Sequence, residues 1–223
     1  MNKKTLLITL LVVALLSALA VAGILAYLVD EGQVDNVFKI GDIEVEITEP
    51  GWTPDTGEDF YPGDGMIKDV KITAQKGDMY FRVIMTFVDL SEDNELADKV
   101  IITDPARIAL IEQTIRFDPD YEPFTLKSYD DLMALPNMVN PNFTFDNTRG
   151  GDGEFYYNYN GILTEGNFVY FITNIVIDEE FTQEDHDILG RYAVTFRVEA
   201  VQAKNIADVD AAMLALDASF HSA

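Results

Sequence analysis

Residues 79–87 read MYFRVIMTF, and apolar side chains occupy every second position of this run from Met79 to Phe87. Arg82 and Thr86 fall between them, on the opposite face. A period of two is typical of a β-strand that presents one face to a hydrophobic core. The run therefore predicts a long strand around which the rest of the fold is built.

The same period recurs before and after this strand. Residues 43–47 and 70–74 alternate on its N-terminal side, and residues 155–159 and 192–200 alternate on its C-terminal side. The nearly continuous apolar run 168–177 indicates one more strand, covered on both faces. So many strands with frequent turns predict an all-β fold, a jelly-roll-like two-sheet β-sandwich.

Two turns suggest which strands are paired. Gln75-Lys76-Gly77-Asp78 separates the strands at 70–74 and 79–87, which predicts a hairpin between them. Asn160-Gly161 follows the strand at 155–159, and this dipeptide is a strong signal for a second hairpin.

A few helices interrupt the strand pattern, and two of them belong to an insertion at 89–150. Asp104 and Pro105 can cap and open a helix over 105–113, and a second short helix is expected over 129–135. Near the C-terminus, apolar residues recur every three or four positions, which predicts an amphipathic helix: Ile206, Val209, Met213, Leu216 and Phe220. This apolar stripe packs either on its own domain or on a partner.

Charge and composition exclude several classes of function. The 223 residues include 15 Lys and Arg but 39 Asp and Glu, a net charge of −24 that repels nucleic-acid phosphates. There is no cysteine, so disulfides and thiol chemistry are excluded. The two histidines, His186 and His221, match no serine-hydrolase or zinc-peptidase motif, and we predict that the protein is not an enzyme. The rival reading is a secreted hydrolase that uses carboxylates or His186.

The N-terminus has the features of an export signal. Lys3 and Lys4 precede residues 5–29, which carry no charge and are mostly Leu, Val, Ile and Ala. Small residues crowd the second half of this segment, which favours cleavage by a signal peptidase. The segment is also long enough to stay as a membrane anchor, which needs about 20 apolar residues. Either way, the rest of the chain is expected outside the cytoplasm.

One acidic cluster is a weak candidate for a calcium site. Its carboxylates alternate along one stretch of chain, as calcium ligands often do: Asp178, Glu180, Glu184, Asp185 and Asp187. The alternative is a solvated loop between two strands, and no other cofactor or metal is expected.

Several segments, taken in order, resemble the TasA/camelysin family of exported proteins. They are residues 23–30 running into 37–45, Pro62-Gly63-Asp64, Tyr80-Phe81-Arg82-Val83, Tyr156-Tyr157 with 161–167, and Glu199-Ala200-Val201-Gln202-Ala203. The resemblance covers most of the chain outside 89–150. It implies a leader, residues 1–26, that a SipW-type signal peptidase removes between Ala26 and Tyr27, leaving 27–223 as one domain. Camelysin-like members are sometimes labelled metallopeptidases, but no zinc motif here supports that activity.

The resemblance further implies a jelly-roll subunit of extracellular fibres or of a biofilm matrix. In TasA-like fibres, the N-terminal segment of one subunit pairs with the sheet of the next. Here that polymerisation strand would carry the apolar residues Tyr27, Leu28, Val29, Val34, Val37 and Phe38. Such head-to-tail contacts generate filaments. The segment could instead fold back as an edge strand of its own domain. The alternative function is a membrane-anchored or secreted acidic module that binds calcium or a glycan and stays monomeric.

Overall fold

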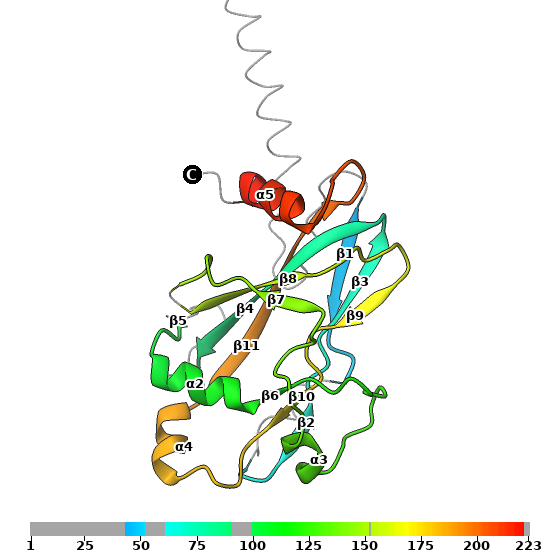
Figure 1. Cartoon of the computed structure of the whole chain (residues 1–223). Coiled ribbons are helices and arrows are strands. Elements are labelled where there is room, and N and C mark those ends of the chain that lie inside the picture. Colours follow the sequence, from blue (N-terminus) through cyan, green and yellow to red (C-terminus); the bar gives the residue numbers. More distant parts are fainter. Residues whose placement is uncertain (1–42, 52–60, 91–99, 152, 221–223) are drawn as a thin grey trace, which may run out of the picture. The chain divides into compact units, whose positions relative to one another are not determined.

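The computed structural model describes residues 43–51, 61–90, 100–151 and 153–220 (Figure 1). All described residues belong to one unit that spans residues 36–223. This unit consists mostly of antiparallel β-strands with a few short helices, as predicted for an all-β sandwich.

The largest sheet, here called the large sheet, is built around the long strand predicted at 79–87. Its strands run in the order β11, β4, β8 and β7, and β5 also pairs with β4. Their bounds are β4 (Met79–Asp89), β5 (Val100–Ile101), β7 (Phe143–Phe145), β8 (Glu154–Tyr159) and β11 (Tyr192–Gln202). β4 and β11 pair along their whole length, from Met79 opposite Gln202 to Asp89 opposite Tyr192.

The described residues form two further sheets of three strands each. The small sheet has the order β1-β3-β9, and the end sheet has the order β2-β10-β6. Their bounds are β1 (Glu44–Thr48), β3 (Lys71–Lys76) and β9 (Phe168–Tyr170), then β2 (Gly65–Ile67), β10 (Asn174–Val176) and β6 (Ile115–Arg116).

The hydrophobic core lies between the large and the small sheet. The alternating residues of β4, from Met79 to Phe87, are fully buried and belong to the same apolar cluster as Val45 and Ile72 of the small sheet. Aromatic rings continue the core: Phe81 and Phe143 are 5.8 Å apart between centroids, and Phe143 and Phe171 are 5.0 Å apart. The period of two therefore identified the inward face of this strand correctly.

Four helices are described, and the sequence predicted three of them. α2 (Pro105–Thr114) is capped by Asp104 as expected, α3 (Tyr129–Met133) begins after Ser128, and α5 (Val209–Phe220) is the C-terminal amphipathic helix. α4 (Gln183–Leu189) was missed because its acidic sequence resembles a solvated loop. It begins with a capping box between Thr182 and Asp185, which explains why acidic residues favour a helix here.

Both predicted hairpins are wrong, because each turn carries the chain from one sheet to another. β3 belongs to the small sheet and β4 to the large one, although Gly77 has the positive φ of a turn, 74°. β8 and β9 are separated in the same way, and Gly161 lacks the positive φ of an Asn-Gly hairpin turn. The two segments that pass between sheets instead form hydrogen bonds with each other. Met79 N donates to Leu163 O at 3.0 Å, and Leu163 N donates to Met79 O at 2.9 Å.

The single strand predicted over 168–177 is also wrong, since the segment divides between two sheets. β9 pairs with β3 in the small sheet, whereas β10 pairs with β2 and β6 in the end sheet. Between them, Phe171 N donates to Val70 O at 2.8 Å and Val70 N donates to Ile172 O at 3.1 Å. The chain thus stays beside its neighbour while it changes sheets, which a continuous apolar run does not reveal.

Candidate functional site

A buried ion pair lies on the outer face of the large sheet, opposite the core. Arg82 of β4 stands directly across from Glu199 of β11, and neither side chain is exposed. Arg82 Nε donates to Glu199 Oε2 at 2.7 Å, and a second guanidinium nitrogen approaches the same oxygen at 2.6 Å. Removing both charges from water is costly, so each depends on the other for compensation.

Further charges connect this pair to α5 and to the loop before β8. Arg82 Nη1 donates to Asp217 Oδ1 of α5 at 2.7 Å, and Arg149 pairs with the other oxygen of Asp217. Arg197 pairs with Glu199. The Arg82 guanidinium also lies over the Tyr156 ring, 5.3 Å from its centroid. We call Arg82, Arg149, Arg197, Glu199 and Asp217 the charge network.

The charge network and the Tyr156 ring beside it bring together residues from three strands. Arg82, Tyr156 and Glu199 come from strands β4, β8 and β11 of one sheet. α5 covers this end of the sheet through Ala212, Met213 and Leu216, which pack on Tyr80. The apolar stripe of α5 therefore packs on its own domain, one of the two alternatives left open by the sequence. Because its charged groups bind one another, the network fastens α5 to the sheet.

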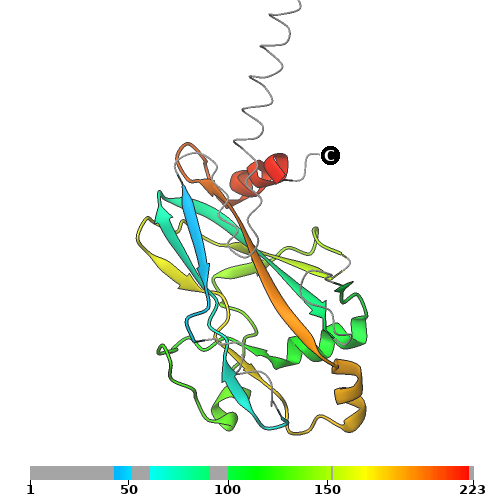
Figure 2. The ribbon, with the colours of Figure 1, turned by 180° about the vertical axis from the view of Figure 1, so that it is seen from behind.

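The outer edge of β11 is a second feature with a bearing on function. β11 pairs with β4 over eleven residues, but no strand in the described part of the chain pairs with its other side. β1, at the edge of the small sheet, likewise pairs only with β3 among the described strands. β1 and β11 approach each other and then diverge (Figure 2). The unpaired edge of β11 is eleven residues long, and an edge of this length is a template for another strand. We call this edge of β11 the open edge.

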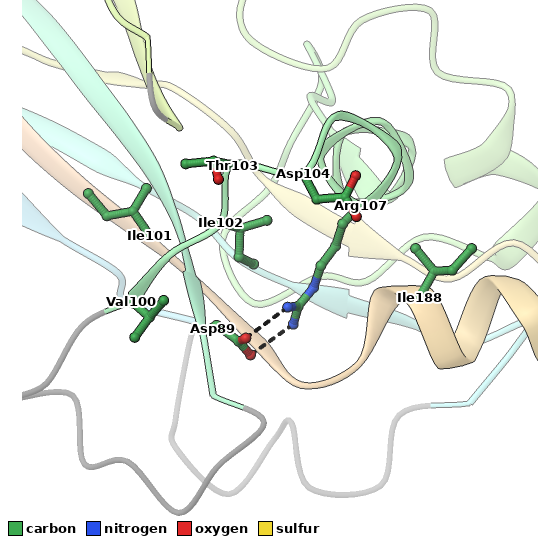
Figure 3. A pocket seen from close by; sticks show the side chains of 8 residues that line it. All are labelled: Asp89, Val100, Ile101, Ile102, Thr103, Asp104, Arg107 and Ile188. Carbon is green, nitrogen blue, oxygen red and sulfur yellow. Dashed lines mark hydrogen bonds and ion pairs between the residues drawn. The ribbon is translucent and has the colours of Figure 1, made fainter.

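A shallow hollow of about 350 Å³ lies beside α2 and the start of β5 (Figure 3). Val100, Ile101 and Ile188 form part of its apolar lining. Its charged lining residues are Arg107, Asp89 and Asp104, and Arg107 makes a two-point contact with Asp89 at 3.0 and 3.1 Å. The same guanidinium donates to the carbonyl oxygens of Leu189 and Arg191, both at 2.9 Å. Arg107 thus links α2 to the chain that follows α4, a role in the fold.

The candidate calcium ligands do not converge on one point. Asp185 accepts hydrogen bonds from Thr182 at the start of α4, and these bonds lower the pKa of its carboxyl group. Asp187 accepts from Gln183 at 2.9 Å, and Asp178 accepts from Tyr129 and from the backbone N–H of Glu180. Glu184 lies in the first turn of α4. Within the described residues, no three His, Asp or Glu side chains are grouped to hold a metal ion.

His186, the residue of the rival hydrolase reading, lies on α4 with its ring 6.3 Å from that of Phe181. Two predictions for the N-terminus, cleavage between Ala26 and Tyr27 and the polymerisation strand within 27–38, concern residues outside the described part of the chain. The part of the chain that the structure does cover contains no helix long and apolar enough to cross a membrane.

Comparison with models of known protein families and with curated proteins finds no match for this chain.

Proposed function

We propose that this chain is an exported structural subunit that polymerises head to tail into extracellular fibres of a cell surface or biofilm matrix. Each subunit, after removal of residues 1–26, donates its N-terminal strand to the next. The sandwich that receives the strand has, in this proposal, the jelly-roll-like topology implied by the family resemblance. The signal peptidase is a partner during export, and the membrane is contacted only through the leader.

The open edge of β11 is the observation that carries this proposal. Its backbone N–H and C=O groups on that side meet no strand from the described residues. Long exposed edges promote unwanted association unless something covers them. A donated strand would satisfy these groups and place its side chains beside the core residues Val194 and Val198.

The lengths of donor and acceptor also agree. Residues 27–38 form a 12-residue segment, and β11 has 11 residues. At about 3.3 Å per residue, each spans about 36–40 Å in extended form. A contact between one subunit's N-terminus and another's sheet uses two different surfaces, so it does not close on itself and generates a filament.

Electron microscopy of the protein beginning at Tyr27 tests the proposal. We expect filaments, and we expect that deleting residues 27–38 abolishes them. A finer pair of variants is Val34→Asp, which charges an apolar donor position, and Gln33→Asp, which alters a polar one. The first should prevent filaments and the second should preserve them. Filaments that persist after the deletion would rule out strand donation.

The alternative, an anchored or secreted monomeric module, makes different predictions for the protein isolated from the cell surface or the medium. It requires either that the intact mass of the cell-surface form corresponds to a chain beginning at Met1, or that the released domain sediments as a monomer. The fibre proposal requires that the intact mass corresponds to a chain beginning at Tyr27 and that the protein sediments as large assemblies. Calcium titration by calorimetry separates the metal-binding form of the alternative from its glycan-binding form.

A further inference from the structure

The outer face of the small sheet combines polar and aromatic side chains in register. Thr48 of β1, Lys71 of β3 and Tyr170 of β9 form one row across the three strands. Glu46, Thr73 and Phe168 form the next row. The residues between them, among them Ile72, face the core. This outer face is thus polar over β1 and β3 and aromatic along β9.

Aromatic rings continue from β9 onto the loop between β6 and α3. Phe168 and Tyr170 lie 5.5 Å apart between ring centroids, and Tyr170 and Tyr121 lie 5.2 Å apart. Phe124 adjoins Tyr121, because its backbone N–H donates to the Tyr121 hydroxyl at 3.3 Å. We call Phe168, Tyr170, Tyr121 and Phe124 the aromatic ridge.

The aromatic ridge is held in place although much of it faces solvent. Phe168 is 51% exposed and Phe124 is 69% exposed. The Tyr121 hydroxyl donates to the buried carboxylate of Asp69 at 2.8 Å, and Lys71 Nζ lies 4.1 Å from the centre of the Phe168 ring. Rings fixed in this way lose little conformational freedom when a ligand binds to them.

The backbone conformation of Phe124 also supports a role in binding. Its φ is 64°, in the left-handed region that favours glycine and that bulky residues rarely adopt. An exposed phenylalanine in that conformation contributes little to a folded monomer and carries a cost in strain. Exposed apolar patches and strained residues are both typical of contact surfaces.

We propose that the outer face of the small sheet binds a neutral polysaccharide. The C–H faces of sugar rings stack on aromatic rings, whose faces are electron-rich. Thr48, Thr73 and Glu46 supply hydroxyl and carboxylate groups that can hydrogen-bond to sugar hydroxyls. The net charge of −24 opposes polyanionic chains, so the ligand is uncharged. This function goes beyond fibre formation and does not depend on it, since the face belongs to each subunit.

Affinity electrophoresis in native gels containing a soluble neutral β-glucan or glucomannan tests the proposal. The Val34→Asp protein beginning at Tyr27, which the fibre proposal expects to stay unpolymerised and so to enter the gel, is run in these gels and in gels that contain polyanionic alginate. We expect retardation by at least one neutral polymer and none by alginate. Absence of retardation by every neutral polymer of the panel, or equal retardation by alginate, would overturn the proposal.

Variants assign the binding to the ridge. Phe168→Ala and Tyr170→Ala should each weaken the affinity about tenfold, whereas Phe168→Trp, which retains a ring, should preserve binding. Phe145→Ala is the matched control, because Phe145 is 48% exposed but belongs to β7 of the large sheet. Unchanged affinity in both alanine variants would refute the assignment. So would a change in sedimentation without a change in retardation, because the ridge would then contact a second copy of the chain.

Discussion

The outer faces of the large and the small sheet differ in how far they are covered from solvent. On the large sheet, α5 and the charge network cover the outer end of β4, so that Tyr80 and Arg82 are buried like core residues. On the small sheet, Phe168 remains half exposed and its neighbours are polar. Both faces begin from the same alternating pattern, and the large sheet differs because α5 and the charge network cover it. We infer that the first face serves stability and the second is free for recognition.

The largest effect is expected from breaking the buried ion pair. Glu199→Leu leaves the Arg82 charge buried without its main partner, which should cost about 3–5 kcal/mol in free energy of unfolding. Denaturant titration measures this loss. The double variant Arg82→Met, Glu199→Leu removes both charges and should recover most of the stability. A loss below about 1 kcal/mol in the single variant would mean that water reaches the pair.

The next effect concerns the helix that covers the large sheet. Leu216 of α5 is fully buried, so Leu216→Ala should reduce the free energy of unfolding by about 2–5 kcal/mol. Leu214, on the same helix, is 70% exposed, and Leu214→Ala should change it by less than about 0.5 kcal/mol. Equal effects of the two substitutions in thermal or denaturant unfolding would show that α5 does not cover the sheet in solution.

Alkaline pH should affect the tyrosines of both faces. Burial and the hydrogen bond to the Asp69 carboxylate raise the pKa of Tyr121 on the small sheet side. Burial and the Glu154 charge raise the pKa of Tyr156 on the large sheet. In each case the fold favours the protonated phenol, so this stabilisation is present below about pH 10 and is lost as the pH rises through the raised pKa.

The corresponding measurement is the pH dependence of unfolding for Tyr121→Phe and Tyr156→Phe. Between neutral pH and about pH 10 each variant should follow the slope of the unmodified protein. Above that pH each should lose stability less steeply than the unmodified protein. Identical slopes above pH 10 would contradict the protonated, hydrogen-bonded state of these phenols.

The smallest effect on stability is expected at the outer face of the small sheet. Phe168→Ala removes a large ring that is half exposed, and its free energy of unfolding should change by no more than about 0.5–1 kcal/mol. Circular dichroism melting checks this value. A loss as large as that of Leu216→Ala would show that the ridge belongs to the core, and the contrast between the two faces would disappear.

Local patterns were sufficient to predict the longer strands and three of the four described helices. The period of two identified the buried face of β4, and Asp104 with Pro105 identified the start of α2, because these signals lie within a few residues of each other. The turn at Gly77 was recognised, but a tight turn can join paired strands or cross between sheets. Here the outcome depends on the backbone hydrogen bonds between Met79, just after this turn, and Leu163, which is far away in the sequence.

The candidate sites could not be predicted for the same reason. Arg82 looked like a solvent-facing residue, and its burial depends on Glu199, 117 positions later, and on α5. The aromatic ridge joins Tyr121 and Phe124 to Phe168 and Tyr170, which no sequence motif connects. Only the register of β3 with β9 reveals that Lys71 stands between the polar and the aromatic part of this face.

Strand donation, the central claim, can be tested directly because the chain has no cysteine of its own. One batch of mature protein carries Gln33→Cys, at a polar position of the donor segment, and a second batch carries Thr195→Cys on the outer face of β11. The batches are mixed and treated with a short bismaleimide. The account predicts cross-linked heterodimers between the two batches. It is contradicted if no heterodimer forms while a chain carrying both cysteines cross-links only within itself.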